Sequence, residues 1–126
     1  MGALFSGKTI IVVDDEIDLR EIVSEHLQMH GARVLEAENG TQAFEIATSQ
    51  RPDAIISDVR MPNGDGVELL KRLRASQFAT PPAFVFMTGY ADITSDEVAK
   101  LGAQGMIGKP FKLQELNEIL KKHLLA

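Results

Sequence analysis

The sequence predicts one α/β domain, in which an open parallel sheet is covered by helices on both faces. Short runs of β-forming residues alternate with longer segments whose apolar residues have helical spacing. Strict alternation of strand and helix favours parallel pairing through right-handed crossovers, and such crossovers place helices on both faces. A length of 126 residues with 44% hydrophobic residues fits a single domain, residues 1–126, with a packed core.

The predicted elements follow one another in a regular order. The strands are expected at Thr9 to Val13, Arg33 to Ala37, Ala54 to Ser57, Ala83 to Met87 and Gly105 to Ile107. Four helices are indicated by apolar stripes at Leu19, Ile22, Val23 and Leu27; Ala43, Phe44 and Ala47; Val67, Leu70 and Leu73; and Leu113, Leu116, Ile119, Leu120 and Leu124. Gly31 follows the first stripe as a stop signal.

A further helix, the fourth in chain order, is expected between Thr94 and Leu101 and has a thin apolar face. Thr94 and Glu97 nevertheless have the spacing of a capping box, which marks a helix start. We therefore expect this helix to be short and mobile.

Composition and charge exclude several classes of protein. The formal net charge is −5, which disfavours direct binding to nucleic acid. The chain has no cysteine, so disulfides, thiolate metal sites and sulfur redox chemistry are ruled out. The longest apolar runs are far too short to cross a bilayer, and the first residues do not form a secretion signal. We expect a soluble, cytoplasmic protein with no membrane partner.

Gly2, Gly7, Lys8 and Thr9 match the pattern of a phosphate-binding loop. A working loop of this kind leaves a strand and enters a helix, whose first amides bind the phosphates. Here no strand is predicted before the motif, and a strand follows it. The context argues against nucleotide binding through this match.

His26 and His30 lie four residues apart on the first predicted helix, a spacing that can bind zinc. Residue 27 is Leu, and the neighbouring sequence offers no third ligand. Solvated helix histidines are the better interpretation.

Polar residues follow the predicted strands at their carboxyl ends. The first strand runs into Asp14, Asp15 and Glu16, the third into Asp58, the fourth into Thr88 and Gly89, and the fifth into Lys109 and Pro110. Each residue alone has a plain explanation as a cap, a turn or a solvated side chain. Because the carboxyl ends of parallel strands meet at one edge of a sheet, we expect these residues to lie together.

Gathering Asp14, Asp15 and Asp58 costs roughly a few kcal/mol per pair at ~4 Å and an effective dielectric constant of ~20. A hard divalent ion would offset this repulsion, and carboxylates with a backbone carbonyl and water suit Mg²⁺. Lys109 adds a fixed positive charge, and Thr88 adds a hydroxyl. A carboxylate in such surroundings is arranged for phosphoryl transfer onto the carboxylate itself.

The chain resembles a bacterial response-regulator receiver domain over essentially its whole length. The residues that carry the resemblance are Asp14 and Asp15, Asp58-Val59-Arg60-Met61-Pro62 with Gly64-Asp65-Gly66, Thr88-Gly89, and Lys109-Pro110-Phe111. The resemblance implies a flavodoxin-like (βα)5 three-layer sandwich whose parallel strands have the order 2-1-3-4-5. It also makes the bond between Lys109 and Pro110 a candidate cis peptide.

The resemblance further implies roles for the site residues. Asp58 would accept the phosphoryl group, and Lys109 would pair with it. Asp15, Asp58 and the backbone carbonyl of Arg60 would bind Mg²⁺, while Asp14 would help through water. Thr88 would form a hydrogen bond to the phosphoryl group.

A phospho-accepting signalling domain is implied, rather than a conventional enzyme. A sensor histidine kinase or phosphotransfer protein would supply the phosphoryl group, which the domain would lose slowly by its own hydrolysis. The output would run through the fourth helix, fifth strand and fifth helix, with Thr88, Tyr90 and Met106 as switch residues. Met106 stands where many receivers have an aromatic residue. Arg60 and Tyr90 are expected to set the lifetime of the phosphate.

The downstream partner has no motif in the sequence. A phosphorylation-dependent homodimer is one option that stays open. The sequence also leaves open whether the domain acts alone or belongs to a longer regulator or a hybrid kinase.

The strongest alternative is an aspartate-nucleophile phosphatase of the haloacid dehalogenase type. That chemistry wants a second Asp two residues after the nucleophile as general acid, and Arg60 occupies this place. A flavin-binding module of similar fold would need a loop rich in Ser, Thr and Gly after the first strand. Asp14, Asp15 and Glu16 would instead repel a phosphate there.

Overall fold

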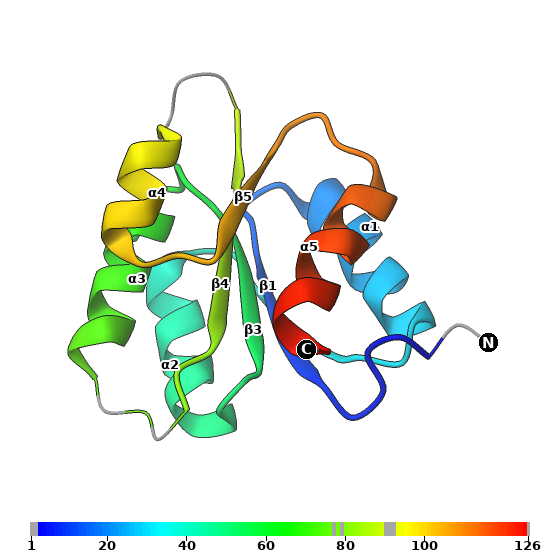
Figure 1. The fold of residues 1–126 in the computed structure, drawn as a ribbon. Helices are drawn as coiled ribbons and strands as arrows, with labels where there is room; N and C mark the ends of the chain where they lie inside the picture. Colours follow the sequence, from blue (N-terminus) through cyan, green and yellow to red (C-terminus); the bar gives the residue numbers. More distant parts are fainter. Residues whose placement is uncertain (1–2, 77, 79, 90–92, 126) are drawn as a thin grey trace.

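The strands and helices alternate as the sequence predicts. The computed structural model describes residues 3–76, 78, 80–89 and 93–125 (Figure 1). The elements are β1 (Thr9–Val13), α1 (Ile17–Met29), β2 (Arg33–Ala37), α2 (Gly40–Gln50), β3 (Ala54–Asp58), α3 (Gly66–Ala75), β4 (Ala83–Thr88), α4 (Ser95–Leu101), β5 (Gly105–Gly108) and α5 (Leu113–Leu124). β3, β4 and β5 each extend one residue beyond their predicted end, because their pairing continues through Asp58, Thr88 and Gly108.

All the strand pairs are parallel, and the sheet has the order β2-β1-β3-β4-β5. α2, α3 and α4 cover one face, and α1 and α5 cover the other (Figure 1). The predicted flavodoxin-like (βα)5 sandwich is confirmed.

The core consists of two apolar clusters, one on each face of the sheet. Successive side chains of a strand point to opposite faces, so Ile11 and Val13 of β1 join the cluster beneath α2 and α3. Ile10 and Val12 of the same strand join the cluster beneath α1 and α5. Because both faces of the sheet are buried, the ends of the central strands have fixed positions. The candidate functional residues lie at these ends or directly after them.

The fourth helix is short, as predicted, with seven residues from Ser95 to Leu101. Thr94 and Glu97 form the expected capping box, and Val98 is its one buried residue. The predicted mobility of this helix stays a prediction.

His26 and His30 depart from the expectation of solvated side chains, because both are half-buried. The rings of the two histidines meet edge to face at 4.7 Å. The Nε2 atom of His26 lies 2.7 Å from Oδ1 of Asn117 on α5. Periodicity within one helix could not show this contact, because α5 reaches α1 only through the tertiary fold.

The match to a phosphate-binding loop near the amino end lacks the helix that such a loop requires. Lys8 leads directly into β1, so no helix follows the glycine. Gly2 lies outside the described residues. Across the described ranges, no helix is long and apolar enough to span a membrane.

Gly66, the first residue of α3, packs closely against the end of β3. A Cβ atom at this position would collide with the carbonyl oxygen of Asp58 and would lie 3.0 Å from Oγ of Ser57. We expect Gly66→Ala to destabilise the fold by about 1–3 kcal/mol, because backbone cannot easily move aside. Chemical denaturation measures this loss. Gly108→Ala is the matched control, since its added Cβ meets nothing within 4 Å; equal stabilities of the two variants would contradict the expected clash.

Candidate functional site

Four of the predicted site residues lie at the carboxyl edge of the sheet. Asp14 follows β1, Asp58 ends β3, Thr88 ends β4, and Lys109 follows β5. β1 and β3 are neighbours in the sheet, so the chain brings Asp14 and Asp58 to adjacent positions. The expectation that these strand ends meet is confirmed by the sheet order.

Lys109 is the cationic centre of this edge. Its Nζ atom lies 3.0 Å from Oδ2 of Asp58, 3.3 Å from Oδ2 of Asp14 and 3.4 Å from Oε1 of Glu16. The amide of Lys109 donates a hydrogen bond of 2.7 Å to the carbonyl of Thr88, which continues the β4–β5 pairing to the lysine. The Lys109–Pro110 bond is cis, as the resemblance implies.

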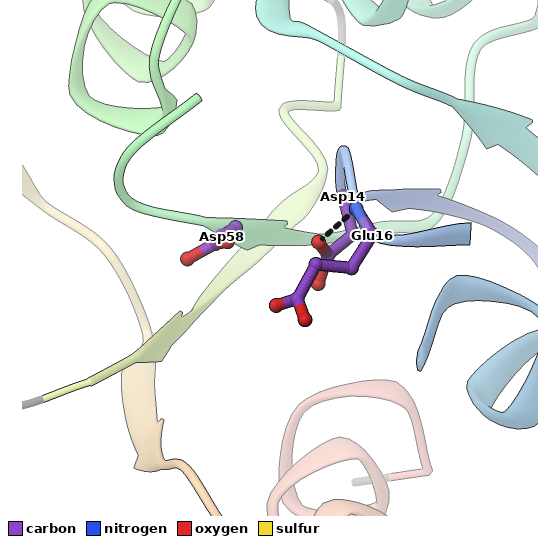
Figure 2. A group of neighbouring side chains, drawn as sticks. All are labelled: Asp14, Glu16 and Asp58. Atoms are coloured by element: carbon purple, nitrogen blue, oxygen red, sulfur yellow. Dashed lines mark hydrogen bonds between the residues drawn. The ribbon is translucent and has the colours of Figure 1, made fainter. Parts of the chain in front are cut away.

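Three carboxylates surround this ammonium group. Asp14, Glu16 and Asp58 each offer an oxygen within 4.8 Å of the others (Figure 2). Backbone amides orient two of them: Glu16 donates to Oδ1 of Asp14 at 2.9 Å, and Val59 donates to Oδ1 of Asp58 at 2.8 Å. With all groups ionised, three carboxylates and one ammonium leave a local charge of about −2.

Burial changes the acidity of these groups. Burial raises the pKa of the Asp14 carboxyl above its ordinary value, although the Glu16 amide and the Lys109 ammonium oppose the rise. Burial likewise raises the pKa of Asp58, against the opposing hydrogen bond and charge of Lys109. Burial lowers the pKa of Lys109, but its contacts with Asp58 and Asp14 outweigh this and raise the pKa overall. The lysine is therefore held in its charged form beside acids that bind protons more tightly than usual.

The carboxylate group differs in one member from the set derived from the sequence. Glu16 lies in the group, whereas Asp15 has an exposed side chain outside it. The Asp15 charge still contributes to the raised pKa of Asp58. The sequence placed Glu16 at this edge but gave it no role in the site; its spacing of two from Asp14 was the available signal. The role of Asp15 as a metal ligand stays a prediction.

The remaining predicted residues have different surroundings. Thr88 is buried, and its Oγ1 donates to the carbonyl of Gly89 at 3.0 Å. Arg60 is exposed two residues beyond Asp58. Met106 on β5 is 37% exposed. Tyr90, the third predicted switch residue, lies outside the described residues.

Fold and site together define a class of protein: a doubly wound α/β domain whose acidic edge, centred on one lysine, fits a phosphorylation site. A family model for the response regulator receiver domain matches residues 10–121. The chain belongs to this family, which is the receiver domain of two-component systems. This membership decides against the phosphatase-type alternative.

Individual relatives agree with that assignment. The chain is 34% identical over 119 residues to sporulation initiation phosphotransferase F of Bacillus subtilis, covering 94% of each chain. It is 36% identical over 116 residues to the regulatory protein AtoC of Escherichia coli, covering 91% of this chain and only 25% of that protein. The domain therefore matches one relative almost completely and a quarter of another.

Among solved structures, one similar fold is the receiver domain of a sensor histidine kinase from Pseudomonas aeruginosa PAO1, which has a magnesium ion coordinated in its active site cleft. The TM-score is 0.84 at 29% identity, and the alignment covers 96% of this chain and 100% of that one.

Proposed function

We propose that this domain accepts a phosphoryl group on Asp58 from the phosphohistidine of a sensor histidine kinase or phosphotransfer protein. The observation that carries the proposal is the contact of 3.0 Å between Nζ of Lys109 and Oδ2 of Asp58. It places a fixed cation against a carboxylate at the open edge of the sheet. The predicted cytoplasmic location stays a prediction.

In the proposed reaction, a carboxylate oxygen of Asp58 attacks the phosphorus atom. A new O–P bond forms, the N–P bond of the phosphohistidine breaks, and the imidazole leaves with the bonding electrons. The Val59 amide and Lys109 each contact one oxygen of Asp58, so the carboxylate is oriented before the donor arrives. Lys109 also favours the ionised form that attack requires.

Mg²⁺ fits the donor set at this edge, because hard carboxylate oxygens are its preferred protein ligands. Asp14, Glu16 and Asp58 offer such oxygens close together, and Asp15 and the Arg60 carbonyl are further ligands by the resemblance. The ion would neutralise charge on the phosphoryl oxygens. The proposal is also supported by the similar receiver domain with its magnesium ion.

The test is incubation with acetyl phosphate, with Mg²⁺ or with EDTA. We expect one phosphoryl group per chain by mass spectrometry, only with Mg²⁺, and its loss in mild base, which is typical of an acyl phosphate. Labelling that is independent of Mg²⁺ or survives base would contradict an aspartyl phosphate.

Mg²⁺ should stabilise the folded chain, because it offsets the negative charge of the acidic edge. At ten times its dissociation constant, the ion should add about 1.4 kcal/mol, which a melting curve detects as a rise of several degrees. We expect Asp15→Asn to lose this gain, because the resemblance makes Asp15 a ligand, and Glu16→Gln to keep most of it, because the resemblance gives Glu16 no such role. The reverse result would identify Glu16 as the ligand. No gain in the wild type would contradict a metal site here.

The phosphodonor needs a surface beside Asp58, and we propose the groove between α1 and the loop after β5. This groove measures about 760 Å³ and is lined mainly by apolar atoms, with Leu19, Ile22 and Phe111 among them. Lys109 lines it as well, so it opens directly onto the acidic edge. Because the groove continues into the acidic edge, its proposed occupant is a protein that presents a phosphohistidine to Asp58.

Ile22 gives a direct test of this surface, because its side chain is 53% exposed. We expect Ile22→Lys to slow phosphoryl transfer from a phosphorylated histidine phosphotransfer protein about tenfold or more, since a central apolar contact is lost. Phosphorylation by acetyl phosphate should not change. Met29→Lys is the matched control, because Met29 ends the same helix and is 79% exposed. Equal effects of both variants would contradict the proposed surface.

The output face is proposed to be α4, β5 and α5, and Thr88, Tyr90 and Met106 remain its proposed switch residues. Exposed Met106 supports a surface that can change its packing, because methionine is flexible. A homodimer that forms through this face upon phosphorylation is one option.

A further inference from the structure

A second hollow lies at the opposite edge of the sheet, where the strands begin. It measures about 460 Å³, within the usual range of small-molecule sites. Lys8, Arg51 and His123 contribute basic groups to its lining, and Phe78, Pro81 and Leu124 contribute apolar surface. We call this hollow the basic groove. Its residues precede β1, β3 and β4 or end α5, so only the folded chain brings them together.

The basic groups of this groove have unusual surroundings. In the described part of the chain, the side chains of Lys8, Arg51 and His123 form no ion pair and no hydrogen bond. One carboxylate, that of Asp53, also lines the groove, and its Oδ2 accepts the amide of Thr9 at 2.8 Å. Among the described residues that line the groove, Lys8, Arg51 and His123 thus face one carboxylate, in a chain whose net charge is −5.

Arg51 occupies a backbone conformation that favours glycine. It caps α2 with φ 48° and ψ 69°, in the left-handed region, where an L side chain is strained. Glycine would suit this cap better, yet the chain has a long cationic side chain here. The folded chain therefore tolerates backbone strain at the residue whose side chain lines the groove.

We propose that the basic groove binds a small organic anion with at least two negative charges, such as a phosphate ester. The charged end would lie between Lys8 and Arg51, and the apolar body would lie against Phe78 and Pro81. The limited volume favours a small molecule over a protein segment, and the net charge of the chain disfavours nucleic acid. The site is independent of Asp58, which lies at the other end of β3.

The first experiment is a titration followed by amide chemical shifts, with pyrophosphate in one arm and ADP in the other. EDTA is present throughout, so that Mg²⁺ does not carry either probe to the acidic edge. We expect both probes to shift the amides of Lys8, Arg51 and Ala83, and ADP to bind several-fold more tightly. Shifts centred on Asp58, or no binding at millimolar probe, would overturn the proposal. Equal affinities would overturn the role of the apolar wall.

The second experiment uses Arg51→Gly, which removes the charge and relieves the left-handed strain. We expect ADP to bind about tenfold more weakly or worse, while the unfolding midpoint stays the same or rises. Phosphorylation by acetyl phosphate should not change, which separates this proposal from that for Asp58. Lys100→Gln on α4 is the control for loss of one positive charge and should bind ADP normally. Unchanged affinity in both Arg51→Gly and Lys8→Gln would overturn the proposal.

Discussion

Asp58→Asn should abolish phosphorylation by acetyl phosphate, because an amide has no anionic oxygen to attack the phosphorus. The substitution keeps the size of the side chain, and its oxygen can still accept the hydrogen bond from the Val59 amide. Mass spectrometry after incubation with acetyl phosphate and Mg²⁺ measures the result. Asp53→Asn is the control, because Asp53 precedes β3 whereas Asp58 ends it. This variant should be phosphorylated to the same extent as the wild type. Undiminished labelling of Asp58→Asn would contradict the assignment of the acceptor.

The same substitution should stabilise the metal-free protein near neutral pH. Burial raises the pKa of Asp58 in the folded state above its unfolded value of 3.8, so the folded chain binds this proton more tightly. The cost of ionising Asp58 is therefore absent below the unfolded pKa and develops as pH rises through the folded pKa. Asp58→Asn should exceed the wild type in free energy of unfolding at pH 7, and the difference should shrink toward pH 4. A difference that grows on acidification would contradict this sign.

Lys109→Met should cost about 3 kcal/mol of stability at pH 7 without metal, because it leaves buried carboxylates without their cation. The side chain of Asp14 is fully buried and that of Lys109 is only 19% exposed, so water replaces the lost ammonium only in part. Urea unfolding in EDTA measures the loss. The loss should diminish as pH falls, because protonation of Asp14 and Asp58 removes the uncompensated charge.

Two comparisons make the lysine prediction specific. Lys121→Met removes a surface contact of 3.4 Å to Glu118 and should cost less than about 1 kcal/mol. In the Asp58→Asn background, Lys109→Met should cost about 1–2 kcal/mol less than in the wild type, since one of its partners is already neutral. Equal costs for Lys109→Met and Lys121→Met, or full additivity with Asp58→Asn, would show that Lys109 is not coupled to the acidic edge.

The sequence by itself determined the order and type of the elements and the edge at which the site lies. Alternation of β-rich runs with helical stripes is a local property, and parallel pairing follows from it through the chirality of crossovers. Parallel strands all end at one edge, so the positions of Asp14, Asp58 and Lys109 could be inferred from strand ends alone. Thr94 and Glu97 likewise predicted the start of α4, because a capping box depends only on nearby residues.

Only the tertiary structure decided which side chains meet beyond the strand ends. After β1 the chain enters a loop, where side-chain directions depend on individual backbone angles rather than on the two-residue period of a strand. Glu16 rather than Asp15 therefore joins Asp14 and Asp58 around Lys109. The contact of His26 with Asn117 depends on the packing of α5 beside α1. The basic groove gathers segments that are far apart along the chain, and no local pattern encodes such a meeting because packing of the whole sheet and its helices sets the distances.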